Sequence, residues 1–98
     1  MLDERFKSSK YAYRVKISDM TDFLKDCDEL GYHWLRGGLA STFNPFKFYE
    51  GDKMEYIKPL QKIEDPNYVF IRCFNGHLDF SFEHNWFFNP VIDYKGEW

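Results

Sequence analysis

The residues whose types could hold a metal ion are histidines and carboxylates in the second half of the chain. His77, Asp79 and His84 stand near one another in the sequence. A zinc site needs about four Cys, His or carboxylate ligands at suitable spacing, and the chain contains no CxxC, HxxxH or HExxH pattern. We therefore predict no metal site, and we expect His77 to pair across a strand with Phe74.

Nucleophilic catalysis would require a Ser or Cys side chain with a base held beside it. The chain has no GxSxG motif. Cys27 and Cys73 stand in apolar, periodic contexts, whereas a reactive cysteine needs an exposed and electropositive one. We predict that both are small buried residues with free thiols, because disulfides are rare in the cytosol.

Two other catalytic patterns also have little support. The acidic residues fall mainly on the predicted solvent-facing side of a helix and in turns, which disfavours a paired-carboxylate hydrolase. The Gly37-Gly38 pair lacks the GxxxxGK pattern of a phosphate-binding loop. We therefore predict that the protein is not an enzyme and uses no cofactor.

Composition narrows the remaining function classes. The chain has 98 residues, enough for one domain, and 21% of them are aromatic. That is too many rings for one small core, so we expect some of them on a functional surface. The net charge of −3 argues against a non-specific nucleic-acid binder. No apolar run is long enough for a membrane span or a signal peptide, which predicts a cytoplasmic protein with no membrane contact.

The first third of the chain predicts a strand followed by a helix. Residues 1–10 are polar and charged, so we expect a flexible arm before a single domain at 11–98. Residues 11–17 alternate between apolar and polar, as in a strand with one buried face. Apolar residues then recur at helical spacing over 20–30. We expect Ser18 or Asp19 to cap the start of this helix and Gly31 to end it.

The middle of the chain predicts short strands around a long loop. Residues 32–35 form a second short strand, which Gly37 and Gly38 end. A ring-rich connection follows at 36–53, and long loops of this kind are usually functional or ordered by their own side chains. We expect further strands at 54–58 and near 91–94.

The clearest local signal is a β-hairpin around Asn75-Gly76. This dipeptide between two apolar runs is typical of a two-residue type I′ turn. The turn fixes the register and therefore the two faces of the hairpin. The predicted core face carries Val69, Ile71, Cys73, Leu78, Phe80 and Phe82. The predicted opposite face carries Tyr68, Phe70, Arg72, Phe74, His77, Asp79 and Ser81.

These elements predict an α+β domain in which one helix packs on a five- to six-stranded, mainly antiparallel sheet. A single helix covers only one face of such a sheet. The other face is then covered by the 36–53 loop or is an interface, and the sequence leaves both possibilities open. The candidate partner-binding residues are Tyr68, Phe70, Arg72, Phe74 and His77 on the sheet face, then Trp34, Phe46 and Tyr49. Core packing is the alternative for each ring.

Four stretches together resemble small accessory proteins of bacteriophages and prophages of Gram-positive bacteria. They are the strand at 13–17, the run 22–34 ending in Leu-Gly-Tyr-His-Trp, the Gly37-Gly38 loop with Thr-Phe-Asn-Pro-Phe at 42–46, and the ending Val-Ile-Asp-Tyr-Lys at 91–95. The aromatic-rich region 68–90 departs from that pattern. The resemblance implies a short, non-enzymatic, single-domain protein that binds a host factor. Inhibitors of bacterial antiviral defence, anti-CRISPR proteins among them, form a prominent subset.

We therefore expect a phage-encoded binding protein that inhibits a host enzyme or defence complex by protein–protein occlusion in the host cytoplasm. The alternative is an oligomer that sequesters a small nucleotide signal, with rings on the base and Arg14, Arg36 or Arg72 on phosphate. A module that binds or mimics nucleic acid is a third possibility, weakened by the small net charge of −3.

Overall fold

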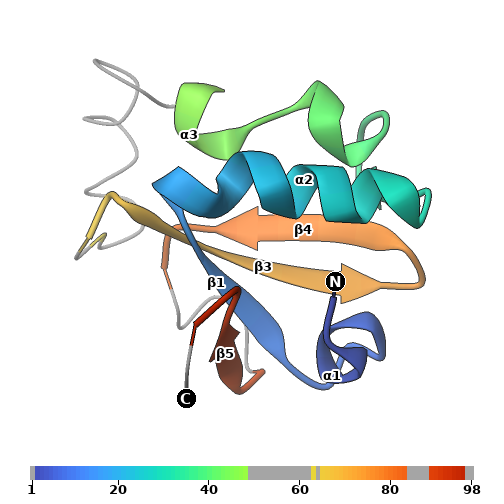
Figure 1. Cartoon of the computed structure of the whole chain (residues 1–98), viewed down its shortest axis with the longest axis horizontal. Coiled ribbons are helices and arrows are strands. Elements are labelled where there is room, and N and C mark those ends of the chain that lie inside the picture. Colours follow the sequence, from blue (N-terminus) through green and yellow to red (C-terminus); the bar gives the residue numbers. More distant parts are fainter. Residues whose placement is uncertain (1, 49–62, 64, 84–88, 97–98) are drawn as a thin grey trace.

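The structure is a computed structural model that describes residues 2–48, 63, 65–83 and 89–96 (Figure 1). The predicted strand at 54–58 lies outside these residues, as does the end of the 36–53 loop. The described strands are β1 (Ala12–Lys16), β2 (His33–Trp34), β3 (Tyr68–Phe74), β4 (His77–Ser81) and β5 (Val91–Asp93). The described α-helices are α1 (Glu4–Lys7), α2 (Met20–Glu29) and α3 (Pro45–Phe48), with 3₁₀ turns at Ile17–Asp19 and Ala40–Thr42.

The strands form one five-stranded sheet in the order β2-β4-β3-β1-β5. The predicted α+β class is confirmed, and the sheet is mixed, with two antiparallel and two parallel strand pairs. β3 is antiparallel to both β1 and β4, whereas β1 pairs with β5 and β2 pairs with β4 in parallel. The direction of β2 follows from the connection after β1. Helix α2 returns the chain to the end of the sheet at which β1 began, and β2 then starts from that end. A helical crossover of this kind makes the strands that it joins parallel.

Helix α2 lies across one face of the sheet (Figure 1). Its apolar residues Met20, Phe23, Leu24 and Cys27 are buried, as their helical spacing predicts. Gly31 follows the helix with φ of 72°, the left-handed conformation that glycine adopts most easily. The start of the helix differs from the prediction. Residue 19 occupies the N-cap position, but the chain enters from a 3₁₀ turn and the Asp19 side chain makes no capping hydrogen bond.

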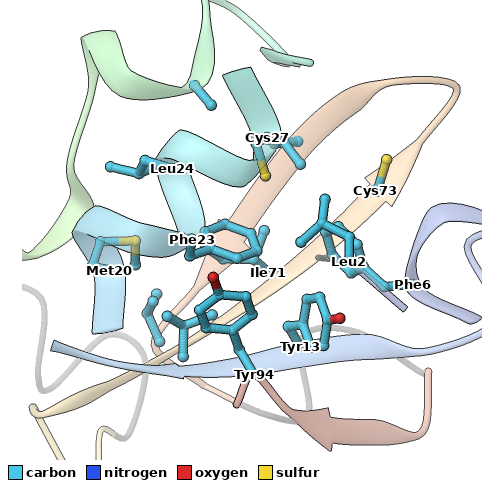
Figure 2. Close-up of a cluster of buried hydrophobic side chains, with 14 of the residues drawn as sticks. Leu2, Phe6, Tyr13, Met20, Phe23, Leu24, Cys27, Ile71, Cys73 and Tyr94 are labelled. Carbon is cyan, nitrogen blue, oxygen red and sulfur yellow. The ribbon is translucent and has the colours of Figure 1, made fainter. Parts of the chain in front are cut away.

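The N-terminal segment packs into the core, which corrects the prediction of a flexible arm. Phe6 in α1 is fully buried and its ring stacks on Tyr13 with centroids 4.4 Å apart. Leu2 is also buried, and Figure 2 shows it beside Phe6 and Tyr13. Asp3 caps α1 by accepting a hydrogen bond from the Arg5 backbone N–H at 2.8 Å. Leu2 precedes the N-cap of α1 and Phe6 lies within the helix, and the burial of both side chains in the core anchors an otherwise polar segment.

Both cysteines lie in this core with free thiols, as predicted (Figure 2). Burial raises the pKa of the Cys27 and Cys73 thiols, so neither is an activated nucleophile. Within the described ranges, no helix is long and apolar enough to cross a membrane.

Candidate functional site

The β3–β4 hairpin has the predicted turn and the predicted register. Asn75 and Gly76 both have positive φ, 51° and 78°, as a type I′ turn requires. The observed partners are Phe74 with His77, Cys73 with Leu78, Arg72 with Asp79, Ile71 with Phe80, and Phe70 with Ser81. The hairpin therefore presents the two faces that the sequence predicts, with the inner one against α2.

We call the side of the sheet turned away from α2 the outer face. It combines the outward residues of the hairpin with those of the neighbouring strands. His33 in β2 pairs with His77 and lies on this side, and Arg14 in β1 pairs with Phe70. The most exposed large apolar side chains here are Phe74, with 65% of its surface exposed, and Leu35 just after β2, with 58% exposed.

A hollow of about 450 Å³ lies at the hairpin end of the outer face. We call it the hairpin hollow, and its lining residues are Ser9, Leu35, Arg72, Cys73, Phe74, His77, Asp79 and Asn89. The Arg72 guanidinium lies 3.6 Å from the Asp79 carboxylate, a long contact between two partly exposed groups. Exposed apolar side chains thus stand beside charged groups that remain accessible to a partner.

The other end of the outer face is closed by its own side chains. Arg14 donates two hydrogen bonds to Asp93 of β5, at 2.6 and 2.8 Å. Its guanidinium also lies 4.8 Å from the centre of the Tyr68 ring, within cation–π range. The Asp93 carboxylate raises the pKa of Arg14. Tyr68, a predicted binding residue, therefore belongs to an internal contact.

Two other predicted binding rings belong to the core. Trp34 has 6% of its surface exposed, and its indole N–H donates to the Ala40 carbonyl oxygen at 2.8 Å. Phe46 has 5% exposed and packs edge-on against Phe82. Trp34 follows the alternation of β2 inward, and Phe46 is held by the α3 turn, so neither ring is available to a partner. Tyr49 lies outside the described residues.

The remaining predicted binding residues do not all lie together on the outer face. Arg72, Phe74 and His77 come together around the hairpin hollow, whereas Phe70 is half-buried further along β3. Ser81, expected on the mixed face, is buried and exchanges hydrogen bonds with the Glu83 backbone.

Sequence reasoning missed three residues of the hollow. Leu35 continues the alternation of β2 and follows His33 by two positions, so its outward position could have been found. Ser9 and Asn89 come from distant parts of the chain and are joined by a hydrogen bond from the Asn89 amide to the Ser9 carbonyl, 2.8 Å long. No local pattern connects two such positions.

The hollow combines apolar and charged side chains. In the part of the chain that the structure describes, no three His, Cys, Asp or Glu residues are grouped so as to hold a metal ion. Asp79 faces Arg72, and the thiol nearest the hollow has a raised pKa. What the site offers is an exposed ring, an aliphatic side chain, and one charge of each sign.

The chain was compared with models of known protein families, with curated proteins and with solved structures, and none of the three comparisons finds a significant match. The geometry of the outer face is therefore the main evidence on function.

Proposed function

We propose that the protein binds a partner protein through the hairpin end of its outer face. The observation that carries the proposal is the pair of exposed apolar side chains, Phe74 and Leu35, at the hairpin hollow. Exposed rings beside an arginine are typical of the residues that dominate protein–protein binding energy. Neither side chain contributes much to the fold of the single chain, so their exposure has no structural explanation there.

The charges around the hollow favour a protein over a nucleic acid. Arg72 is matched by Asp79, and His77 stands beside them, so the patch has no excess of positive charge. Nucleic-acid binding depends on unmatched Lys and Arg side chains that displace counterions from phosphates. A protein partner needs only an apolar anchor with a charged rim.

In this proposal binding is itself the activity. A partner side chain fills the hollow between Phe74 and Leu35, and the rest of this small domain covers the neighbouring partner surface. The resemblance to phage accessory proteins supports a host enzyme or an antiviral defence complex as the partner, inhibited by occlusion. This part of the proposal rests on the resemblance alone.

Affinity capture with matched variants tests the proposal. The tagged chain is exposed to a lysate of cells in which the gene occurs, and bound proteins are identified by mass spectrometry. We expect one stoichiometric protein with the wild type and its loss with Phe74→Asp. Phe48→Asp is the control, because Phe48 is also an exposed ring, 47% exposed, but lies in α3. Equal capture by both variants would overturn the proposal.

A further inference from the structure

A second pocket lies beside the hairpin hollow, at the end of β2. It has a volume of about 630 Å³, within the range of about 300–1,000 Å³ that small-molecule sites occupy. We call it the ring pocket, and its lining residues are Trp34, Leu35, Arg36, Gly37, Thr42, Phe43, Leu78, Asp79 and Phe80.

The pocket exists because β2 is only two residues long. Its parallel register pairs Trp34 with Leu78, so the next inward neighbour of Phe80 would be residue 36. The chain turns at that point, where the Gly37 N–H donates to the Trp34 carbonyl at 3.1 Å and the Trp34 N–H donates to the Gly38 carbonyl at 3.0 Å. β2 therefore does not extend alongside Phe80, which lines the pocket.

Three rings form one wall of the ring pocket. The Trp34, Phe43 and Phe80 rings contact one another in pairs, with centroids 5.4 to 5.7 Å apart. The Trp34 indole N–H is already bonded within the core, but Phe43 and Phe80 are only half-buried. They leave apolar ring surface against which a planar group can pack.

The ring pocket contains one positively charged side chain, Arg36, and one negatively charged side chain, Asp79. Arg36 is exposed, and among the described residues no acidic side chain pairs with its guanidinium. The other two arginines that the sequence suggested for phosphate, Arg14 and Arg72, both face carboxylates. Asp79 also lines the pocket, and its carboxylate retains acceptor capacity for an N–H group of a ligand.

We propose that the ring pocket binds a mononucleotide, with the base against Phe43 and Phe80 and the phosphate on Arg36. A planar ring fits the aromatic wall, an anion fits the unpaired guanidinium, and a base N–H fits Asp79. The same chemistry disfavours a purely apolar ligand, which would leave Arg36 unused. The site is complete within one chain.

Calorimetric titration of the purified full chain with AMP, GMP, CMP and UMP tests this site. Each nucleotide is compared with its nucleoside and with inorganic phosphate. We expect at least one nucleotide to bind more tightly than both of its parts, and Arg36→Ala to weaken that binding by about ten-fold or more. Arg36→Lys keeps the positive charge but cannot make the bidentate hydrogen bonds of a guanidinium to phosphate, so we expect an intermediate affinity for the nucleotide.

Lys25→Ala is the matched control, since Lys25 is an exposed cation on α2 away from the pocket. Thermal unfolding of each variant confirms that it is folded. The proposal is overturned if no nucleotide binds at about 1 mM. It is also overturned if Arg36→Ala and Lys25→Ala weaken binding equally, or if phosphate alone binds as tightly as the nucleotide. The ring pocket shares Leu35 and Asp79 with the hairpin hollow, but Arg36 lines only the ring pocket, so the Arg36 variants test this proposal and not the protein-binding one.

Discussion

The two ends of the outer face contain the same residue types and use them differently. At the β1–β5 end, Arg14 is held by two hydrogen bonds to Asp93 and lies over the Tyr68 ring. At the hairpin end, the Arg72 guanidinium lies 3.6 Å from the Asp79 carboxylate, a longer ion pair. Phe74, beside it, has 65% of its surface exposed. An arginine, an aspartate and an aromatic ring thus form an internal contact at one end and an accessible patch at the other.

β5 accounts for the difference. It pairs with β1 and places Asp93 against Arg14 on the outer face. On the inner face Ile92 is buried, and the Tyr94 hydroxyl donates to Asp26 of α2 at 2.5 Å. One three-residue strand therefore closes this end of the sheet from both sides. The hairpin has no comparable strand beside Phe74, which leads us to expect that its outward side chains serve binding and not stability.

The largest expected effect separates a core ring from an exposed one. Trp34→Ala removes a buried ring and a buried hydrogen bond, and should lower the free energy of unfolding by about 3–5 kcal/mol. Phe74→Ala should change it by no more than about 0.5 kcal/mol. Urea unfolding of both variants makes the measurement. A large loss in Phe74→Ala would place that ring in the core and remove the contrast between the two ends.

The hairpin turn should give the next largest effect. Gly76 has φ of 78°, where a Cβ atom costs about 1–2 kcal/mol, so Gly76→Ala should lower the unfolding free energy by about that amount. Gly37→Ala is the control, because a Cβ there would lie 3.5 Å from the Trp34 Cβ, an ordinary contact, and Gly37 is not held at positive φ. Equal losses in the two variants would mean that turn conformation does not set the register.

Tyr94 should make stability depend on alkaline pH. Burial and the Asp26 carboxylate raise the pKa of Tyr94, so its stabilising effect is complete below about pH 10, the unfolded value, and is lost as pH rises above it. Tyr94→Phe loses the hydrogen bond to Asp26, which should cost about 1–1.5 kcal/mol at neutral pH. Its unfolding free energy should also fall less steeply above pH 10 than that of the wild type. Parallel alkaline slopes would contradict this assignment.

The smallest expected effect compares the two arginines directly. Arg14→Ala should cost about 0.5–1 kcal/mol, because the pair is bidentate but partly exposed. Arg72→Ala should cost less than Arg14→Ala, because the ion pair of Arg72 with Asp79 is longer and its side chain is more exposed. Thermal or urea unfolding at low and high salt measures both. A larger loss for Arg72 than for Arg14 would reverse the comparison.

Local patterns predicted much of this fold. The Asn75-Gly76 turn is confirmed, as are a strand at Ala12–Lys16 and a helix at Met20–Glu29. The ends of the two apolar patterns were wrong, because Ile17 and Leu30 lie just beyond these elements and are exposed. The N-terminal segment was not predicted, because the burial of Phe6 depends on Tyr13 and on the distant helix α2. The direction of β2 likewise depends on where a crossover returns to the sheet, which no local spacing encodes.

The candidate site was predicted in part for the same reason. Arg72, Phe74 and His77 follow from hairpin register, and they do meet at one hollow. Residue type alone could not show that the Trp34 and Phe46 rings are buried, because their burial depends on packing between elements that are distant in the sequence. The ring pocket was not predicted, since it lies where β2 ends after two residues, and the sequence predicted a longer strand at 32–35.

Photocrosslinking from position 74 tests the central claim most directly. A benzoylphenylalanine in place of Phe74 keeps an aromatic side chain at the hairpin hollow, and the same substitution at Phe48 supplies an exposed ring in α3 as the control. After irradiation in the lysate, we predict a crosslink to one partner protein from position 74 and none to that protein from position 48. A partner that crosslinks from position 48 and not from position 74 would contradict the account.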